Sequence, residues 1–196
     1  MRTTRAAGVG SGSPAWTGRD IALAGLFAAL TAVGAQIQVP LPFSPVPVVL
    51  SNFFAILAGL TLGARLGVMS QAAYVLAGAV GLPVFAGLRG GVAVLIGPTG
   101  GYLAGFVLAA GVAGLLRGMP PSSTRRATWA AAAAAAAIYV PGVLWLSGVT
   151  GADVHKVALM GVLPFLPGDA LKAVAGGLIA PSLSRAATSR AGRVPS

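Results

Sequence analysis

Long apolar stretches separated by short connections dominate this chain from residue 20 onward. Six of them, each about 17–21 residues long, lie at 20–38, 46–62, 66–82, 98–116, 127–147 and 165–183. A helix needs roughly 20 apolar residues to cross the hydrocarbon core of a bilayer, which is about 30 Å thick. The pattern therefore predicts an all-α integral membrane protein with six transmembrane helices.

Two of the connections are apolar and irregular. Residues 39–47 contain four prolines, which exclude a helix and predict an extended lid. Residues 81–97 are rich in glycine and carry one charged residue, Arg89. Non-helical backbone at membrane depth is tolerated only where it is buried in protein or lines a cavity. Both connections are therefore predicted to cover a pocket.

Composition narrows the class of protein. With 56% hydrophobic and 8% charged residues, a mean hydropathy of +0.87 and no glutamate, the chain has too little polar material to cover a soluble globule. The net charge of +10 comes from basic residues scattered between apolar blocks without interleaved aromatic residues, so no nucleic-acid partner is expected. With no cysteine and one histidine, the chain is predicted to hold neither a metal nor a cofactor.

The distribution of arginine and lysine predicts the orientation in the membrane. When the head, the 62–66 turn, the 117–127 loop and the tail are placed on one side, that side holds ten of the thirteen basic residues: Arg2, Arg5, Arg19, Arg65, Arg117, Arg125, Arg126, Arg185, Arg190 and Arg193. The positive-inside rule then predicts that both termini are cytoplasmic.

This orientation divides the chain into three parts. A flexible basic head (1–18) and a basic tail (186–196) flank a six-helix membrane domain (19–185) with an outward ligand pocket, in a multi-pass protein of the cytoplasmic membrane. The charged residues that remain on the outer side are Arg89, Asp153, Lys156, Asp169 and Lys172.

Asp169 and Lys172 are the most informative of these, because they stand three apart in an otherwise apolar segment. A charged group at membrane depth costs roughly 2.5–3.5 kcal/mol on insertion scales, and such groups usually mark a substrate site or pathway. At this spacing the two side chains lie on one helix face. Blander alternatives stay open: a structural ion pair that joins helices, and for Arg89 a loop residue that reaches the lipid headgroups.

Four runs of sequence carry a resemblance to a known family: Ala28-Ala29-Leu30-Thr31-Ala32-Val33-Gly34-Ala35-Gln36-Ile37, Pro83-Val84-Phe85-Ala86-Gly87-x-Arg89-Gly90-Gly91, Gly97-Pro98-Thr99-Gly100-Gly101-Tyr102 and Pro167-Gly168-Asp169-x-x-Lys172. From about Asp20 to Pro181 the chain resembles the BioY family, the biotin-binding S components of energy-coupling factor (ECF) vitamin transporters. The resemblance implies six transmembrane helices, an outward vitamin pocket beneath loops one and three, and partnership with a transmembrane coupling protein and two ATPase subunits.

The chemistry of biotin suggests roles for the available residues. Asp169 is expected to accept hydrogen bonds from the ureido N–H groups, and Lys172 and Arg89 to meet the carboxylate or the ureido oxygen, with the choice between the two cations open. Further hydrogen bonds are expected from Tyr102, Gln36 and Asn52, and walls for the apolar ring from Phe85, Tyr139 and Trp145. The stretch that ends at Asn52, Pro47-Val48-Val49-Leu50-Ser51-Asn52, departs from the Pro-x-Thr-Leu-Gln that many members have.

Small residues recur every four positions in the first segment, at Ala24, Ala28 and Ala32. Such a strip allows another helix to approach closely. The family resemblance implies that it docks on the coupling subunit, and internal packing is the alternative.

The sequence thus predicts a membrane protein that captures biotin outside the cell and, with an energising partner, releases it inside. One alternative is an S component for another small vitamin. The alternative from a different class is an intramembrane enzyme with Asp169 as general base, which would need a second acid or nucleophile in the same cavity. No second carboxylate stands in a predicted span to fill that role.

Overall fold

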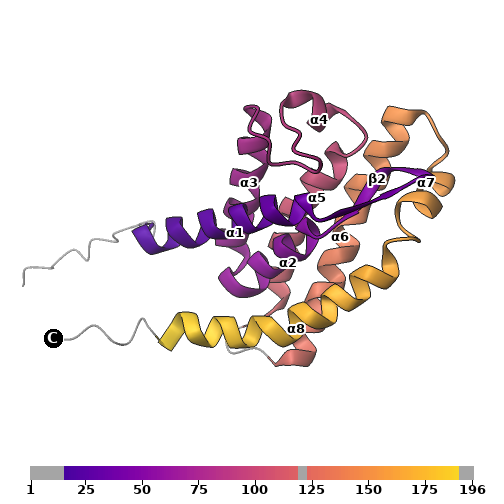
Figure 1. Ribbon diagram of the computed structural model, residues 1–196. Coiled ribbons are helices and arrows are strands. Elements are labelled where there is room, and N and C mark those ends of the chain that lie inside the picture. Colours follow the sequence, from indigo (N-terminus) through magenta and orange to yellow (C-terminus); the bar gives the residue numbers. More distant parts are fainter. Residues whose placement is uncertain (1–15, 119–122, 190–196) are drawn as a thin grey trace, which may run out of the picture.

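The computed structural model describes residues 16–118 and 123–189, which form a helical bundle with one short hairpin of strands (Figure 1). Most of the predicted basic head, including Arg2 and Arg5, and most of the tail, including Arg190 and Arg193, lie outside the described residues. The elements are α1 (Gly18–Gln36), β1 (Gln38–Leu41), β2 (Ser44–Val49), α2 (Ser51–Leu62), α3 (Ala64–Ala79), α4 (Val92–Ile96), α5 (Gly100–Leu116), α6 (Thr124–Thr150), α7 (Val154–Gly161) and α8 (Leu166–Ser189).

Each of the six predicted apolar segments contains a helix: α1, α2, α3, α5, α6 and α8 in chain order. The second is shorter than predicted, because residues 46–49 belong to β2 and the helix begins only at Ser51. Two helices, α4 and α7, form in stretches that were predicted as loops. Both are short, at five and eight residues, and too short for their periodicity to stand out in the sequence.

Polar residues fix where several helices begin. Thr17 and Asp20 form a capping box at the start of α1, in which each side chain accepts a hydrogen bond from the other's backbone N–H. The hydroxyl of Ser123 caps α6, and the carboxylate of Asp153 caps α7. These caps satisfy N–H groups that a helix leaves without partners in its first turn.

Two helices are individually long and apolar enough to cross a membrane, namely α1 and α6. The bent pair of α7 and α8 up to Leu183, with 57° between its two parts, meets the same criterion as one broken span. Helices α2 and α5 are apolar but shorter, with 12 and 17 residues. The chain is therefore a multi-pass membrane protein with two to three clear spans by length and composition.

The proline-rich connection is an antiparallel hairpin, so the fold departs from the all-α prediction at this one place. Val39 pairs with Val48, and Gln38 with Val49. The predicted extended conformation is correct. The two extended halves of the connection pair as a hairpin because a turn at 42–43 brings them face to face. The hairpin reaches from the end of α1 toward α7 (Figure 1).

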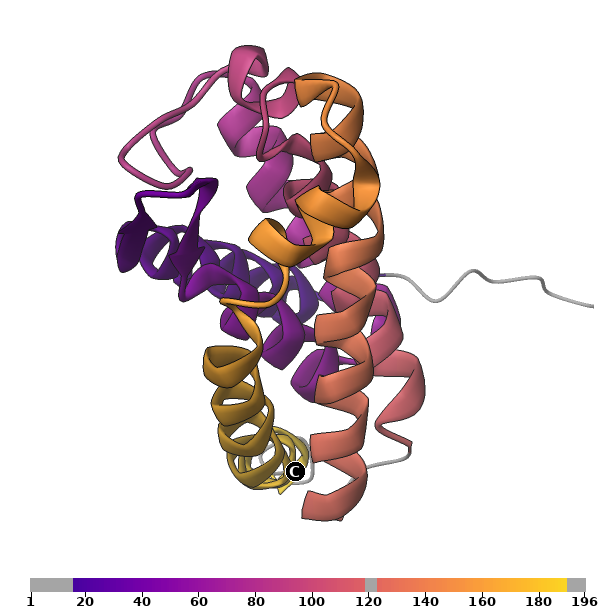
Figure 2. The same cartoon turned by 90° about the vertical axis from the view of Figure 1, so that its right-hand side faces the viewer.

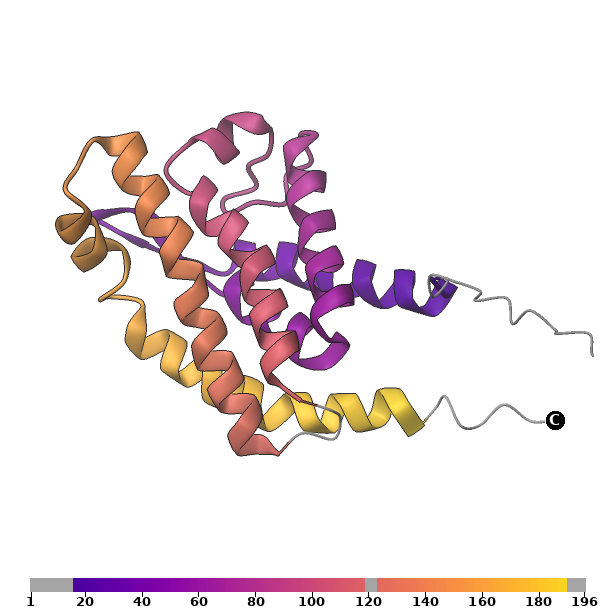
Figure 3. The ribbon, with the colours of Figure 1, turned by 180° about the vertical axis from the view of Figure 1, so that it is seen from behind.

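Helix α5 lies at the centre of the bundle, in contact with α2, α3 and α6. Figure 3 shows α5 and α6 side by side, and Figure 2 shows α8 against the lower half of α6. Small residues on α2 and α5 are fully buried, namely Ala55, Ala58, Ala109, Ala110 and Ala113, and Gly59 of α2 lies against Ala110 and Ala113 of α5. Small side chains let two backbones approach, which is how helices pack where lipid weakens the hydrophobic driving force.

Gly59 on α2 lies in close contact with α5, and its substitution tests the packing. A Cβ at Gly59 would overlap the carbonyl of Ala110, whereas one at Gly25, on the outer face of α1, meets nothing within 4 Å. We expect Gly59→Ala to lower the free energy of unfolding in detergent by about 1–3 kcal/mol, the usual effect of overpacking. Gly25→Ala is the matched control and should leave stability unchanged or slightly raised. Equal thermal unfolding curves for the two variants would contradict the packing described here.

Candidate functional site

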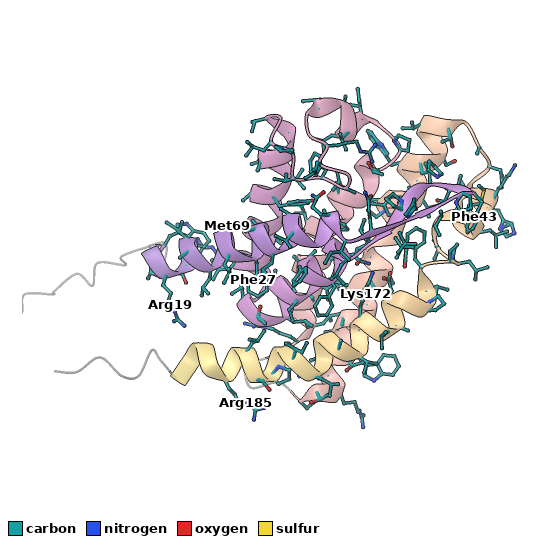
Figure 4. The ribbon with its side chains drawn as sticks, in the orientation of Figure 1. Arg19, Phe27, Phe43, Met69, Lys172 and Arg185 are labelled. Carbon is teal, nitrogen blue, oxygen red and sulfur yellow. The ribbon has the colours of Figure 1, made fainter. Side chains whose placement is uncertain are left out.

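Asp169 and Lys172 lie in the first two turns of α8, just after the bend between α7 and α8. Their side chains form a salt bridge of 3.1 Å between Lys172 Nζ and Asp169 Oδ1. The Asp169 side chain is 8% exposed and that of Lys172 14%. Lys172 lies on the side of α8 that faces the bundle (Figure 4). The predicted placement of both charges on one helix face therefore holds, and the face is an internal one.

The ammonium group of Lys172 has a partner for each of its three hydrogens. It donates to Asp169 Oδ1, to Asn52 Oδ1 at 2.8 Å and to the backbone carbonyl of Val49 at 2.7 Å. An ammonium has three donors and no acceptor. Helix α8 is thereby tied to the end of β2 and to the first turn of α2.

The carboxylate of Asp169 is equally well satisfied. Its Oδ1 also accepts from Asn52 Nδ2 at 2.8 Å, and its Oδ2 accepts from the hydroxyl of Tyr139 on α6. Four predicted site residues, Asn52, Tyr139, Asp169 and Lys172, thus form one hydrogen-bonded network across α2, α6 and α8. Asn52 belongs to it although it stands in the stretch that departs from the family pattern.

The network fits both roles that the sequence left open. As a structural device, it joins three helices through a buried ion pair with every polar atom satisfied. As a recognition site, it holds one anion and one cation in fixed positions, where a polar ligand can exchange its own groups for the internal partners.

A small cavity lies next to the network, beneath the hairpin and the 80–91 loop. It has about 50 Å³ of room for the centres of water-sized molecules. Its lining comes from both connections and from α3 and α5, and includes Val46, Tyr74, Phe85, Arg89, Tyr102 and Phe106. Val49 lines the cavity and also accepts from Lys172, so the two features share a wall. That room suits a few water molecules.

Aromatic rings make up much of the cavity wall. Tyr74 packs edge-on against Phe85, with ring centroids 5.6 Å apart, and stacks on Phe106 at 6.5 Å. Phe85 was predicted from the sequence, whereas Tyr74 and Phe106 were not. Both lie inside long apolar helices, where an aromatic residue that lines a cavity cannot be told from one that only fills the core. The carbonyl of Val49 was also missed, because a backbone acceptor leaves no signature in the sequence.

A second hollow reaches the network from the side. It is a groove of about 440 Å³ between α6 and α8, lined by Tyr139, Asp169 and small residues including Ala132, Ala136 and Ala173. Its walls are almost wholly apolar apart from the hydroxyl and the carboxylate. Asp169 therefore lies between two regions. Its partner Asn52 is on the side of the cavity, and its partner Tyr139 lines this groove.

The other predicted contacts lie away from the network. The hydroxyl of Tyr102 donates to the carbonyl of Gly161 at 3.1 Å and so fastens α7 to α5, while its ring lines the cavity. Arg89 lines the cavity from the loop, with its Nε on the carbonyl of Ala86 at 3.0 Å and its side chain exposed. Trp145 is 42% exposed and donates from Nε1 to the carbonyl of Gly97 at 2.9 Å.

Gln36 is the last residue of α1, and its side-chain amide forms hydrogen bonds with the backbone of residues 84–88. In the predicted docking strip, Ala24 is buried, and Ala28 and Ala32 are partly buried against the core. This placement is what the internal-packing alternative expects. The small residues of α1 that are exposed lie on the face of the helix next to this strip, and they are Ala22, Gly25 and Ala29.

Comparison with known proteins gives consistent matches over nearly the whole chain. Residues 7–189 match the model of the BioY family. A probable biotin transporter BioY of Pyrococcus horikoshii is 44% identical over 165 residues, which cover 84% of this chain and 96% of that protein. The biotin transporter BioY of Thermotoga maritima is 43% identical over 167 residues, covering 85% and 96%.

Among solved structures, the fold resembles a crystal structure of the S-component for biotin from an ECF-type ABC transporter. The TM-score is 0.71 at 25% sequence identity, and the match covers 87% of this chain and 95% of that one. Family, relatives and fold therefore point in one direction.

Removal of one partner from the buried ion pair tests what the network does for folding. We expect Lys172→Met to lower the free energy of unfolding by roughly 3–5 kcal/mol, because it leaves the Asp169 carboxylate buried without a cation. The double variant Asp169→Asn/Lys172→Met should regain part of the loss, since neither charge remains. Lys156→Met, at an exposed position of α7, is the control. Thermal unfolding in detergent measures all four proteins, and a Lys172→Met variant as stable as the parent would show that the pair is not structural.

Proposed function

The chain belongs to the BioY family, and on that premise we propose that it takes up biotin as the substrate-binding S component of an ECF-type transporter. The observation that carries the proposal is the network of Asp169, Lys172, Asn52 and Tyr139 beside an aromatic-lined cavity. Curated relatives named as biotin transporters, and the resemblance of the fold to a biotin S-component, support it. The family is one of transporter components, so the enzyme alternative with Asp169 as general base is set aside.

The functional groups of biotin complement those of the site. Its ureido ring carries two N–H donors and one carbonyl acceptor, its bicycle is apolar, and its tail ends in a carboxylate. Asp169 accepts from the ureido N–H groups, Lys172 and Arg89 serve the carboxylate and the ureido oxygen, and the rings of Tyr74, Phe85 and Phe106 wall the bicycle.

Binding on this proposal is an exchange of hydrogen bonds. Without ligand, every hydrogen of Lys172 and both oxygens of Asp169 already have protein partners. A ligand therefore gains only the difference between its bonds and those it replaces, which favours a molecule that offers both a donor pair and an anion. The hairpin and the 80–91 loop both line the cavity, so one of these two connections moves outward when biotin enters.

The proposed topology has six spans with both termini in the cytoplasm. Support comes from the arginines: α1 begins and α8 ends on the same side of the molecule (Figure 1), where Arg19 and Arg185 lie (Figure 4). The hairpin, the 80–91 loop and α7 then face outward, in the cytoplasmic membrane. The chain carries no phosphate-binding loop motif in its sequence, so a transmembrane coupling protein and two ATPase subunits supply the energy. Helix α1 is proposed as the docking element, with the partly buried Ala28 and Ala32 at the edge of the contact, while Ala24 is buried and packs inside the bundle.

Asp169→Asn tests the role of the carboxylate in biotin binding. The substitution keeps the size of the side chain and removes the charge that strengthens bonds from the ureido N–H groups. We expect the biotin affinity to fall by about 1.5–3 kcal/mol, the range for hydrogen bonds to charged groups. Isothermal titration of folded variant and parent measures it. Equal affinities would exclude Asp169 as a ligand, and tighter binding of a different vitamin by the parent would favour the alternative of another S component.

Single introduced cysteines test the topology, since the natural chain has none. Thr124→Cys lies at the exposed start of α6, and Phe43→Cys at the tip of the hairpin, where the phenylalanine is 51% exposed. In intact cells an impermeant thiol reagent should label the cysteine at 43 and leave the one at 124 unlabelled until the membrane is permeabilised. Labelling of position 124 from outside would overturn the orientation.

A further inference from the structure

The loop that carries Phe85 and Arg89 is a tight, closed turn. Phe85 and Arg89 pair as an isolated bridge through two backbone hydrogen bonds, Phe85 N to Arg89 O at 2.9 Å and Arg89 N to Phe85 O at 3.3 Å. Between them Leu88 has φ +55°, a left-handed conformation that a leucine rarely adopts. A backbone held this way needs support from its surroundings.

The side-chain amide of Gln36 provides that support by bonding to both arms of the turn. Its Nε2 donates to the carbonyl of Phe85 at 3.1 Å and to that of Val84 at 3.5 Å, and its Oε1 accepts from the N–H of Leu88 at 3.0 Å. Backbone carbonyls only accept and a backbone N–H only donates, so the two ends of the amide cannot be exchanged. The same Nε2 also donates to the carbonyl of Ala32 at 3.2 Å, which fixes the side chain on its own helix. Since an amide nitrogen carries two hydrogens, the carbonyls of Phe85 and Val84 share the other one.

The clamped turn places two residues on the cavity. Phe85 is 1% exposed, its ring lies against Gly78 of α3, and it lines the cavity with Arg89. Gln36 itself is not among the cavity-lining residues of the described chain. Its hydrogen bonds connect it to the cavity through the loop, and the direct ligand contact expected from the sequence stays a prediction.

Gln36 also lies next to the start of the hairpin, which is the second connection that covers the cavity. Two residues later β1 starts, and the side chain of Gln38 reaches the neighbourhood of Gly87. Figure 2 shows the 80–91 loop next to the start of the hairpin. The end of α1 is thus the common anchor of both connections that roof the cavity.

We propose that Gln36 is a positioning residue that keeps the 84–89 turn closed over the cavity and so sets how long a bound ligand stays. The proposal rests on the proposed function for the identity of the ligand, biotin, and on the four hydrogen bonds above for the clamp. A ligand beneath the turn leaves when the turn opens, so weakening the clamp raises the dissociation rate more than it changes the association rate.

Gln36→Met tests this proposal, because methionine keeps the length of the side chain and removes all four hydrogen bonds. Lys156→Met, which introduces the same residue at an exposed position of α7, is the control. Hydrogen exchange on the ligand-free proteins should show amides of residues 84–89 exchanging at least roughly tenfold faster in Gln36→Met, with α2 and α8 unchanged. Release of labelled biotin should be roughly tenfold faster, with an association rate within about threefold of the parent.

Gln36→Glu is the second variant, and it carries the test where Gln36→Met fails to fold. A carboxylate keeps the acceptor for Leu88 N–H, but it loses the donors and sets an oxygen against the carbonyls of Val84 and Phe85. It should therefore give changes of the same sign and at least the same size. Unchanged exchange at 84–89, or faster exchange with unchanged biotin release, would overturn the positioning role. Lost affinity with unchanged exchange would make Gln36 a direct ligand contact instead. If the parent itself does not bind biotin, the proposed function is wrong, and the exchange data still decide whether Gln36 holds the turn.

Discussion

The need to satisfy charge within an apolar bundle organises this structure. Lys172 and Asp169 are largely removed from water, and the protein supplies a partner for each hydrogen of the ammonium and each oxygen of the carboxylate. Those partners come from the end of β2, from α2 and from α6. The ion pair therefore fixes how α8 packs against three other elements. Val49 is held by the same bonds, so they also fix the wall of the cavity that Val49 forms.

The same constraint appears in weaker form elsewhere. Gln71, fully buried on α3, donates to the hydroxyl of Thr31 on α1 at 3.1 Å. At the opposite end of the bundle, the guanidinium of Arg117 donates to the carbonyls of Leu60 and Thr61, which the end of α2 leaves without helical partners. Each of these polar side chains links two helices whose remaining contacts are small and apolar. Packing brings the helices together, and the polar bonds determine which residues face one another.

The sequence predicted the helices well because apolar length is a strong signal, and it predicted Asp169 and Lys172 because charges are rare in such segments. It could not predict which polar groups would meet them. Asn52 and Tyr139 were chosen for their chemistry, and only the fold shows that they converge on Asp169. The carbonyl of Val49 has no side-chain signature at all. Gln36 was assigned to the ligand, and its hydrogen bonds to the backbone of a loop 48 residues away could not be predicted from the sequence.

The hairpin between α1 and α2 has a consequence for how copies of this protein meet in a crowded membrane. A two-stranded ribbon has two open edges, and each open edge offers unpaired N–H and C=O groups to a strand from another molecule. Here Pro40 lies in β1, and Pro45 and Pro47 lie in β2. Proline has no N–H to donate, so a foreign strand that lies along either edge loses rungs of its ladder at these positions. The residues that keep this segment from becoming a helix also make the ribbon a poor template for intermolecular sheet growth.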